Sequence, residues 1–139
     1  MANTHTDVYA PFLHAPSPNR IISVLGIPQT DGNRVSISLK NNSTGHHIFH
    51  MALWYSFDDT TIILNTSGEF GWDNEVAFRN INLLTPNERF MASILYEPDG
   101  YHINIDNRFT YSFVKRYNQS LSNRLVIEGQ VLLISVNQQ

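Results

Sequence analysis

The chain has 139 residues, a formal net charge of −3, 42% hydrophobic residues and no cysteine. This length and apolar content indicate one globular domain, residues 1–139, and exclude a disordered chain. Without cysteine the chain has no disulfide and no thiolate metal ligand, and the absence of a basic patch argues against nucleic acid as a partner.

Neither a membrane span nor a signal peptide is recognisable in the sequence. No stretch approaches the roughly 20 apolar residues that cross a bilayer. The first 20 residues contain no apolar run flanked by basic residues. We therefore expect no membrane insertion and a cytoplasmic location, with an extracellular one reached only by a route that uses no signal peptide.

Short segments rich in β-branched and aromatic residues follow one another, separated by turn residues. Three of the turns are residues 30–33, residues 41–45 and the Pro-Asp-Gly sequence at 98–100. No segment has apolar residues at helical spacing for long enough to predict a helix. The pattern is typical of an all-β protein, and we predict a mostly antiparallel β-sandwich. The predicted strands are residues 20–27, 34–41, 47–55, 60–65, 74–78, 89–97, 101–105, 109–117 and 124–136.

The segment HIFHMALWY, residues 47–55, indicates which side chains point away from the core. Successive side chains of a strand point to opposite faces, so the two alternating sets of this segment lie on different faces. One set is fully apolar and is therefore expected to face the core. The inward set is Met51, Leu53 and Tyr55, and the outward set is His50, Ala52 and Trp54.

Two later segments extend the same outward surface. By the same alternation, Asn65 points outward from residues 60–65 and Glu75 points outward from residues 74–78. Trp72 lies in the turn before the second of these segments and can lie over that surface. If the three strands are neighbours, one surface carries His50, Trp54, Asn65, Trp72 and Glu75.

These residue types suit a carbohydrate. A pyranose presents hydroxyl groups for hydrogen bonds and one apolar face of C–H groups, so its site needs an aromatic surface and a few fixed polar groups. Trp72 would be the stacking surface. The polar groups would be His50, Asn65 and Glu75, which supply donors and acceptors between them.

With these motifs the chain resembles the galectin family over almost its whole length. The family pattern in three strands is H-x-N-x-R, V-x-N and W-x-x-E-x-R, and the corresponding segments here are HMALW, ILN and WDNEVA. The tail, from YEPDGYHINI to LVIEGQVLLISV, also resembles the last hairpins and final strand of the family. The resemblance implies a jelly-roll-like sandwich of two antiparallel sheets that binds β-galactosides on its concave sheet.

The resemblance also implies roles for individual residues. His50 would bond the region of the galactose O4, and Asn65 would lie near the galactose O6. Trp72 would stack on the sugar, and Glu75 would bond the second sugar.

Three positions depart from the family pattern. Ala52 stands in place of an asparagine, and Trp54 and Ala77 stand in place of two arginines. The lost guanidiniums are bidentate donors, and each lost hydrogen bond in such a site costs about 1–3 kcal/mol. We therefore predict an altered specificity and weak or absent binding of plain lactose.

Trp54 has three interpretations. It stacks on a different glycan, fills the space of the missing arginine, or contacts a protein partner, since tryptophan is enriched in interfaces. The missing arginines also support a second hypothesis for the whole chain. In that hypothesis the galectin fold has lost sugar binding and serves as a protein-interaction or structural domain.

Metal and catalytic sites are not predicted. His46 and His50 share a strand face but stand about 13 Å apart, and His47 is expected on the opposite face, so the three do not form a zinc site. Glu75 has no second carboxylate on its face for glycoside hydrolysis. We expect no enzymatic activity and no cofactor, with glycans or glycoproteins as partners.

The apolar end of the chain predicts self-association. A strand with one solvated face shows a polar residue at every second position, but the segment QVLLISV is apolar almost throughout. Because an apolar free edge invites pairing, we expect a two-fold homodimer through the terminal strands. Strict alternation places Val131, Leu133 and Ser135 on one face of this segment, and Leu132, Ile134 and Val136 on the other.

Overall fold

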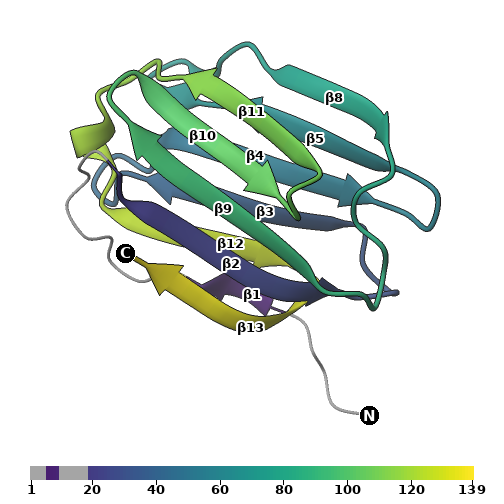
Figure 1. Ribbon diagram of the computed structural model, residues 1–139. Coiled ribbons are helices and arrows are strands. Elements are labelled where there is room, and N and C mark those ends of the chain that lie inside the picture. Colours follow the sequence, from purple (N-terminus) through teal and green to yellow (C-terminus); the bar gives the residue numbers. More distant parts are fainter. Residues whose placement is uncertain (1–5, 10–18) are drawn as a thin grey trace.

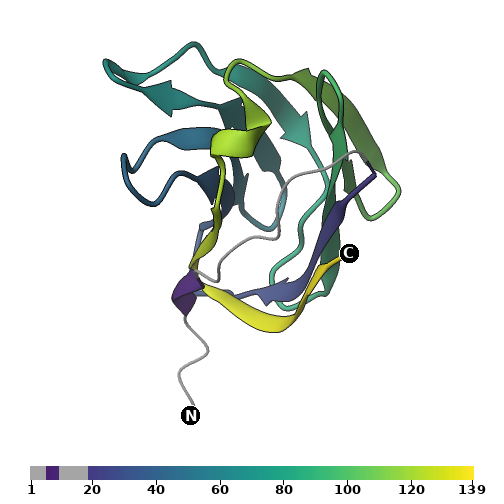
Figure 2. The ribbon, with the colours of Figure 1, turned by 90° about the vertical axis from the view of Figure 1, so that its left-hand side faces the viewer.

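The computed structural model describes residues 6–9 and 19–139, which form two large antiparallel sheets packed face to face (Figure 1, Figure 2). The six-stranded sheet has the order β1 (Thr6–Tyr9), β12 (Arg124–Gly129), β3 (Arg34–Lys40), β4 (His47–Tyr55), β5 (Thr60–Asn65) and β8 (Val76–Ile81). The five-stranded sheet has the order β11 (Phe109–Val114), β10 (Gly100–Ile105), β9 (Phe90–Glu97), β2 (Ile21–Pro28) and β13 (Val131–Gln138). The predicted all-β antiparallel sandwich is confirmed.

Two smaller elements complete the described chain. A hairpin of β6 (Ser67–Gly68) and β7 (Gly71–Trp72) follows β5, in a segment that the sequence predicted only as a turn. The single helical turn among the described residues is the 3-10 turn η1 (Gln119–Leu121). No helix in residues 6–9 and 19–139 is long and apolar enough to cross a bilayer.

The core lies between the two sheets, and the alternation along each strand decides which side chains enter it. On β4 the predicted inward set is buried, whereas Trp54 on the opposite face is 41% exposed. Each fully buried aliphatic or aromatic side chain contributes about 1.5–3 kcal/mol to stability. The largest such side chains of the two sheets are Ile37, Leu39, Phe49, Met51, Leu53, Ile62 and Leu64 of the six-stranded sheet and Phe90, Ile94, Tyr101 and Ile103 of the five-stranded sheet.

The predicted single strand of residues 124–136 is wrong, because the chain changes sheets at Gln130. β12 pairs with β3 in one sheet, and β13 pairs with β2 in the other. Gly129 allows the change of direction, since its φ of +122° is disfavoured for other residues and an added Cβ would lie 2.1 Å from the Arg34 carbonyl oxygen. The stretch Glu128, Gly129 and Gln130 interrupts the apolar residues at this point and marks the break in the sequence.

The predicted alternation along residues 131–136 is also wrong. The register of β13 against β2 shifts between Leu133 and Ser135, as in a β-bulge. Leu133 and Val136 therefore both pack against the core, although three positions separate them. Leu132 and Ile134 remain exposed, each at 40%.

Candidate functional site

The outer face of the six-stranded sheet carries polar and aromatic side chains in rows of directly opposed residues. The first row is Arg124, Lys40 and His47, the second is Val126, Ser38, His50 and Asn65, the third is Glu128, Ser36, Ala52, Ile63 and Ala77, and the fourth is Arg34, Trp54 and Thr61. A pocket of about 370 Å³ opens over the second to fourth rows, and we call it the aromatic pocket. Its lining residues are Arg34, His50, Ala52, Trp54, Ile63, Asn65, Trp72 and Glu75, which include all five residues predicted from the sequence.

The β6–β7 hairpin places Trp72 over this face. Gly71 adopts a positive φ of +95° at the turn of the hairpin, and Trp72 pairs with Ser67 on the returning strand. The indole of Trp72 is 54% exposed, and its ring centroid lies 4.9 Å from that of His50. The two tryptophans therefore line one pocket, as the alternation and spacing predicted.

His47 also belongs to this site, which corrects the prediction that it faces away from His50. The register of β3 against β4 shifts between the pairs Leu39–Phe49 and Lys40–His47, so β4 carries one extra residue there. This bulge turns His47 onto the face of His50, and their ring centroids lie 5.2 Å apart. The His47 ring also lies 4.4 Å from the indole of Trp72, tilted by 32°.

The hydrogen bonds of His50 indicate which ring nitrogen carries the proton. Its Nδ1 lies 2.6 Å from the Ser38 Oγ, and its Nε2 lies 3.5 Å from a guanidinium nitrogen of Arg34. A guanidinium only donates hydrogen bonds, so the tautomer with Nε2 as acceptor and Nδ1–H as donor to Ser38 is the one that satisfies both contacts. The contact to Arg34 is long, which leaves Nε2 available to accept a hydroxyl proton from a ligand.

Both histidines are neutral at physiological pH. Burial, the neighbouring His47 and the positive charge of Arg34 together lower the pKa of His50 to about 3. Burial and the charge of Lys40 lower the pKa of His47 to about 4. The centre of the site therefore offers acceptors of fixed position rather than a positive charge.

Arg34 supplies a guanidinium that the family motifs of this chain lack. It lies directly opposite Trp54 on the neighbouring strand, and its Cζ stands 5.3 Å from the Trp54 ring centroid. This is the geometry of a cation–π contact. This contact holds Arg34 beside His50. Arg34 lies on β3 and Asn65 on β5, so the two residues flank His50 from opposite sides.

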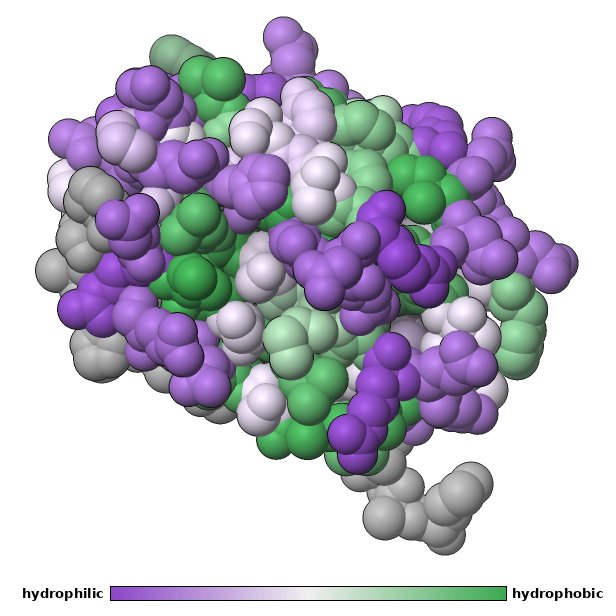
Figure 3. All heavy atoms as spheres, viewed as in Figure 1, coloured by the Kyte–Doolittle hydropathy of each residue, from purple (hydrophilic) through white to green (hydrophobic). Residues whose placement is uncertain are grey.

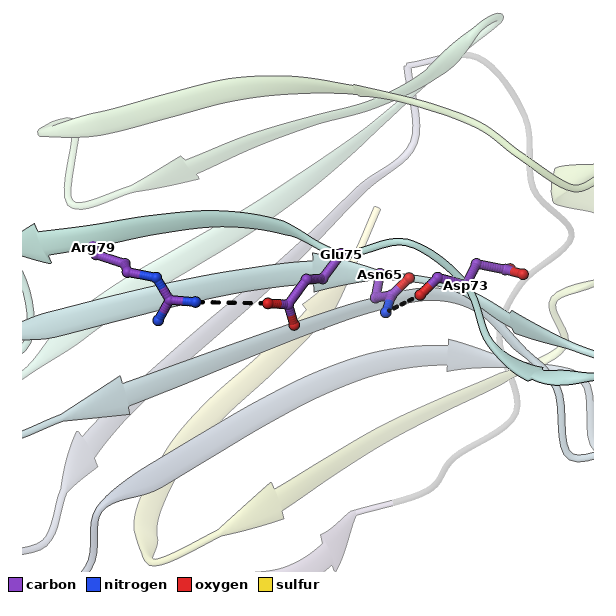
Figure 4. A network of polar contacts seen from close by, with 4 residues as sticks. All are labelled: Asn65, Asp73, Glu75 and Arg79. Atoms are coloured by element: carbon purple, nitrogen blue, oxygen red, sulfur yellow. Dashed lines mark hydrogen bonds and ion pairs between the residues drawn. The ribbon is translucent and has the colours of Figure 1, made fainter.

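Asn65 is almost fully engaged by the protein itself. Its Oδ1 accepts hydrogen bonds from the Thr66 backbone N–H at 2.8 Å and from Arg116 at 3.1 Å. Its Nδ2 donates to the Asp73 carbonyl at 3.0 Å (Figure 4). One N–H of the amide is left for a ligand, so Asn65 is oriented as a donor.

The bond from Asn65 to Asp73 is part of a network that ties the Trp72 hairpin to β5. The Asp73 carboxylate accepts hydrogen bonds from Thr66 at 2.8 Å and from the Tyr117 hydroxyl at 2.6 Å. These bonds, from Tyr117 first and then Thr66, lower the pKa of the Asp73 carboxyl. Trp72 precedes Asp73 in the chain, so the network fixes the base of the hairpin that carries the indole.

Glu75 closes the other end of the aromatic pocket. Its carboxylate forms an ion pair with Arg79 at 3.6 Å, and both side chains are about half exposed (Figure 4). Such an exposed pair contributes about 0–1 kcal/mol to stability. The second arginine of the family motif corresponds to Ala77 in this chain. Arg79 supplies a guanidinium two positions farther along.

Sequence reasoning missed Arg34, His47 and Arg116. Arg34 lies at an outward position of its predicted strand, but only the pairing of that strand with residues 47–55 places it beside Trp54. His47 depends on a bulge, which alternation does not predict. Arg116 reaches Asn65 from 51 positions along the chain, and nothing in the local pattern indicates that contact.

No metal site is found in the described part of the chain. None of its histidine, aspartate and glutamate side chains gather in a group of three or more that could hold an ion.

Comparison with known proteins gives the family. The sequence model of the galactoside-binding lectins matches residues 8–138 of this chain. The chain belongs to this family. Galectins are non-enzymatic lectins, and carbohydrate binding is the property that the family shares.

Solved structures agree on the galectin fold. Sheep galectin-11, in a complex with glycerol, superposes with a TM-score of 0.84 over 96% of this chain and 98% of the other, at 15% sequence identity. In total 167 chains of solved structures match this galectin domain. A search of curated proteins finds no match.

Proposed function

We propose that this galectin domain is a single carbohydrate-recognition domain, that it binds glycans of the β-galactoside type in the aromatic pocket, and that its specificity differs from that of a lectin with the full family motifs. The observation that carries the proposal is the joint placement of Trp72, neutral His50 and the Arg34 guanidinium around one open pocket. Together they offer an apolar surface, a fixed acceptor and fixed donors, which are the three needs of a sugar ring.

The ring spacing restricts how a sugar lies. A ring stacked between two others needs about 3.5–4 Å on each side, so it does not fit between the Trp72 and His50 rings at their centroid distance of 4.9 Å. The sugar therefore lies over the Ala52 side of His50. It contacts the exposed part of the indole and reaches Nε2 from the open pocket.

Two features support an altered specificity. Ala52 offers no hydrogen bond, and the guanidinium of Arg34 approaches from β3 instead of from position 54 of β4. Trp54 adds a second aromatic surface at 41% exposure. A glycan with a further apolar face or substituent gains from Trp54, whereas plain lactose loses donors and gains little.

A glycan array followed by titration calorimetry tests the proposal. We expect at least one galactose-terminated glycan to bind more tightly than lactose. Trp72→Ala should then weaken that binding about 100-fold, since the stacking surface contributes roughly 2–3 kcal/mol. Phe70→Ala is the matched control, because Phe70 lies two positions away in the same hairpin and is 97% exposed. An array without any bound glycan, or equal effects of the two substitutions, would contradict the proposal.

The second candidate is a protein-interaction domain without sugar binding. Its supporting observation is the exposure of large apolar side chains, namely Trp54 at 41% in the pocket, Phe57 at 67% in the turn after β4 and Phe70 at 97% in the hairpin that carries Trp72. A protein-interaction domain becomes the better interpretation if the well-folded protein binds no glycan on the array.

Homodimerisation through the terminal strands is part of the proposal. β13 is an edge strand of its sheet, and its Leu132 and Ile134 are each 40% exposed. A two-fold contact there would cover both side chains and present two pockets on one particle, as glycan cross-linking requires. Light scattering at rising micromolar concentration tests this, and a mass that stays monomeric would contradict it.

A further inference from the structure

A second pocket opens beside the aromatic one, on the same face of the six-stranded sheet. It has a volume of about 320 Å³ and lies over β12, the end of β3 and the turn that follows β3. We call it the basic pocket. Its lining residues are Lys40, Asn41, Asn42, Gly45, Arg124, Val126 and Glu128.

The charges at one end of this pocket are unusual. Arg124 lies directly opposite Lys40 on the neighbouring strands, and Lys40 in turn lies opposite His47. Like charges directly opposed across two strands repel each other and destabilise the pair. In the described part of the chain neither cation has a carboxylate partner, and Arg124 donates a hydrogen bond to the Asn42 amide oxygen at 2.6 Å. Within the described residues the two positive charges are thus left without a compensating carboxylate.

The turn beside these cations is held in place by its own hydrogen bonds. The Asn41 Oδ1 accepts from the backbone N–H groups of Ser43 and Thr44, each at 3.0 Å. The Asn42 backbone N–H donates to Asn123 at 2.8 Å, so the turn is also tied to the segment before β12. Arg124 is therefore oriented before any ligand arrives, and the contact to Asn42 uses only one of its five N–H donors.

Glu128 does not cancel this end of the pocket. It lies on the same face of β12 as Arg124, but four residues farther along the strand, which corresponds to about 13 Å. Val126 lies between them and is buried. The pocket thus has a positive end at Lys40 and Arg124 and a carboxylate at its far end.

We infer that the basic pocket binds an anionic group, a carboxylate or a sulfate ester, carried by the glycan whose neutral sugar occupies the aromatic pocket. This inference rests on the proposed function and names the class of its ligand as acidic glycans. His47 connects the two pockets, because it contacts Trp72 in one and lies opposite Lys40 in the other. Arg124 lies two strand spacings from His47, or about 10 Å, which is within reach of the next unit of a short oligosaccharide. An anion between the two cations would replace their repulsion by charge-assisted hydrogen bonds.

The test compares glycans that differ only in charge. Titration calorimetry is run with a neutral galactose-terminated glycan, its sialylated form and its sulfated form. At low salt we expect at least one acidic form to bind about tenfold more tightly than the neutral parent, and we expect higher salt to reduce this preference. The sialylated and sulfated forms show which anion the pocket accepts.

Variants locate the preference. The double variant Lys40→Gln/Arg124→Gln should bind the acidic and neutral glycans equally well, with unchanged affinity for the neutral one. The control Arg89→Gln/Lys115→Gln removes two exposed charges outside both pockets and should keep the preference. The swap Lys40→Arg/Arg124→Lys keeps both charges and should also keep most of it, which separates a charge effect from a folding defect.

Each outcome decides a different point. Neutral and acidic glycans that bind equally to the unchanged protein would overturn the inference and leave the proposed function standing. A preference that survives the Lys40→Gln/Arg124→Gln substitution would also overturn it. If no glycan binds, acidic or neutral, both the inference and the proposed function are wrong.

Discussion

Two histidine–serine pairs bridge neighbouring strands, one on the outer face of each sheet. His50 lies opposite Ser38 with its Nδ1 at 2.6 Å from the hydroxyl, and His102 lies opposite Ser112 with its Nδ1 at 3.0 Å. His50 is only 7% exposed, whereas the bond of His102 lies in solvent. The local chemistry of the two pairs is the same, so their difference comes from what lies above them.

Trp72 from β7, Arg34 from β3 and His47 from the bulge at the start of β4 itself cover His50. The bond between His102 and Ser112 is exposed, and hydrophilic and hydrophobic residues are interspersed on the face of the five-stranded sheet seen in Figure 3. A histidine on an outward strand position therefore becomes a candidate binding group only when tertiary structure desolvates it and fixes its proton.

The largest expected difference between the two pairs is in glycan binding after each histidine is removed in turn. His50→Ala should weaken binding of the best array glycan about 30- to 100-fold, because it removes the accepting nitrogen and a contact of the Trp72 ring, worth roughly 2–3 kcal/mol. His102→Ala should change binding less than about twofold. Calorimetry on both variants decides, and similar losses would show that the covered histidine has no special role.

The pH dependence of stability tests the burial of His47 and His50 next. Between pH 6.5 and pH 4 the unfolded chain protonates His47 and His50 while the folded chain does not, since their folded pKa values are about 4 and 3. The free energy of unfolding is therefore fully retained above pH 6.5 and falls as the pH is lowered, for His50 on the order of 2 kcal/mol by pH 5.

Denaturant titrations at several pH values measure this effect. His50→Gln should flatten the dependence between pH 6.5 and 5. An unaltered slope in His50→Gln would mean that other groups cause the loss.

Substitution of Arg116 tests whether the hydrogen bonds that orient Asn65 contribute to glycan binding. Arg116→Met removes the hydrogen bonds to Asn65 and Thr66 at 3.1 and 3.3 Å, so Asn65 loses part of its orientation. We expect glycan binding to weaken three- to tenfold, about 1 kcal/mol, with little change in the melting temperature. Lys115→Met is the adjacent control and should bind normally. Equal binding by both variants would show that the remaining partners of Asn65 suffice.

The smallest expected effect concerns Tyr117. Tyr117→Phe removes the hydrogen bond to the Asp73 carboxylate but leaves the one from Thr66. Because both groups are solvent-exposed, we expect less than about 1 kcal/mol of lost stability and less than a twofold change in binding. Thermal unfolding and calorimetry measure the two quantities. A loss of binding as large as that of Trp72→Ala would show that this one bond holds the hairpin in place.

The sequence by itself determined most of the strands and, away from the bulges, which side chains face the core. Alternation is a local property of an extended chain, so the inward set of β4 and the outward positions of Trp54, Asn65 and Glu75 follow from residue order alone. The motif spacing likewise predicted that Trp72 lies on the surface that carries His50, and their ring centroids are 4.9 Å apart.

Tertiary structure alone decided what completes the site. Register between strands is set by distant partners, so the bulge that turns His47 toward His50 has no signal within residues 47–55. The placement of Arg34 beside Trp54 depends on strand pairing, and the reach of Arg116 to Asn65 depends on the packing of segments 51 positions apart. Glu128, Gly129 and Gln130 mark the place of the break in the sequence, but only the pairing of β12 with β3 and of β13 with β2 shows that the chain changes sheets there. Local pattern thus gives the direction of a side chain, and only long-range pairing gives its neighbours.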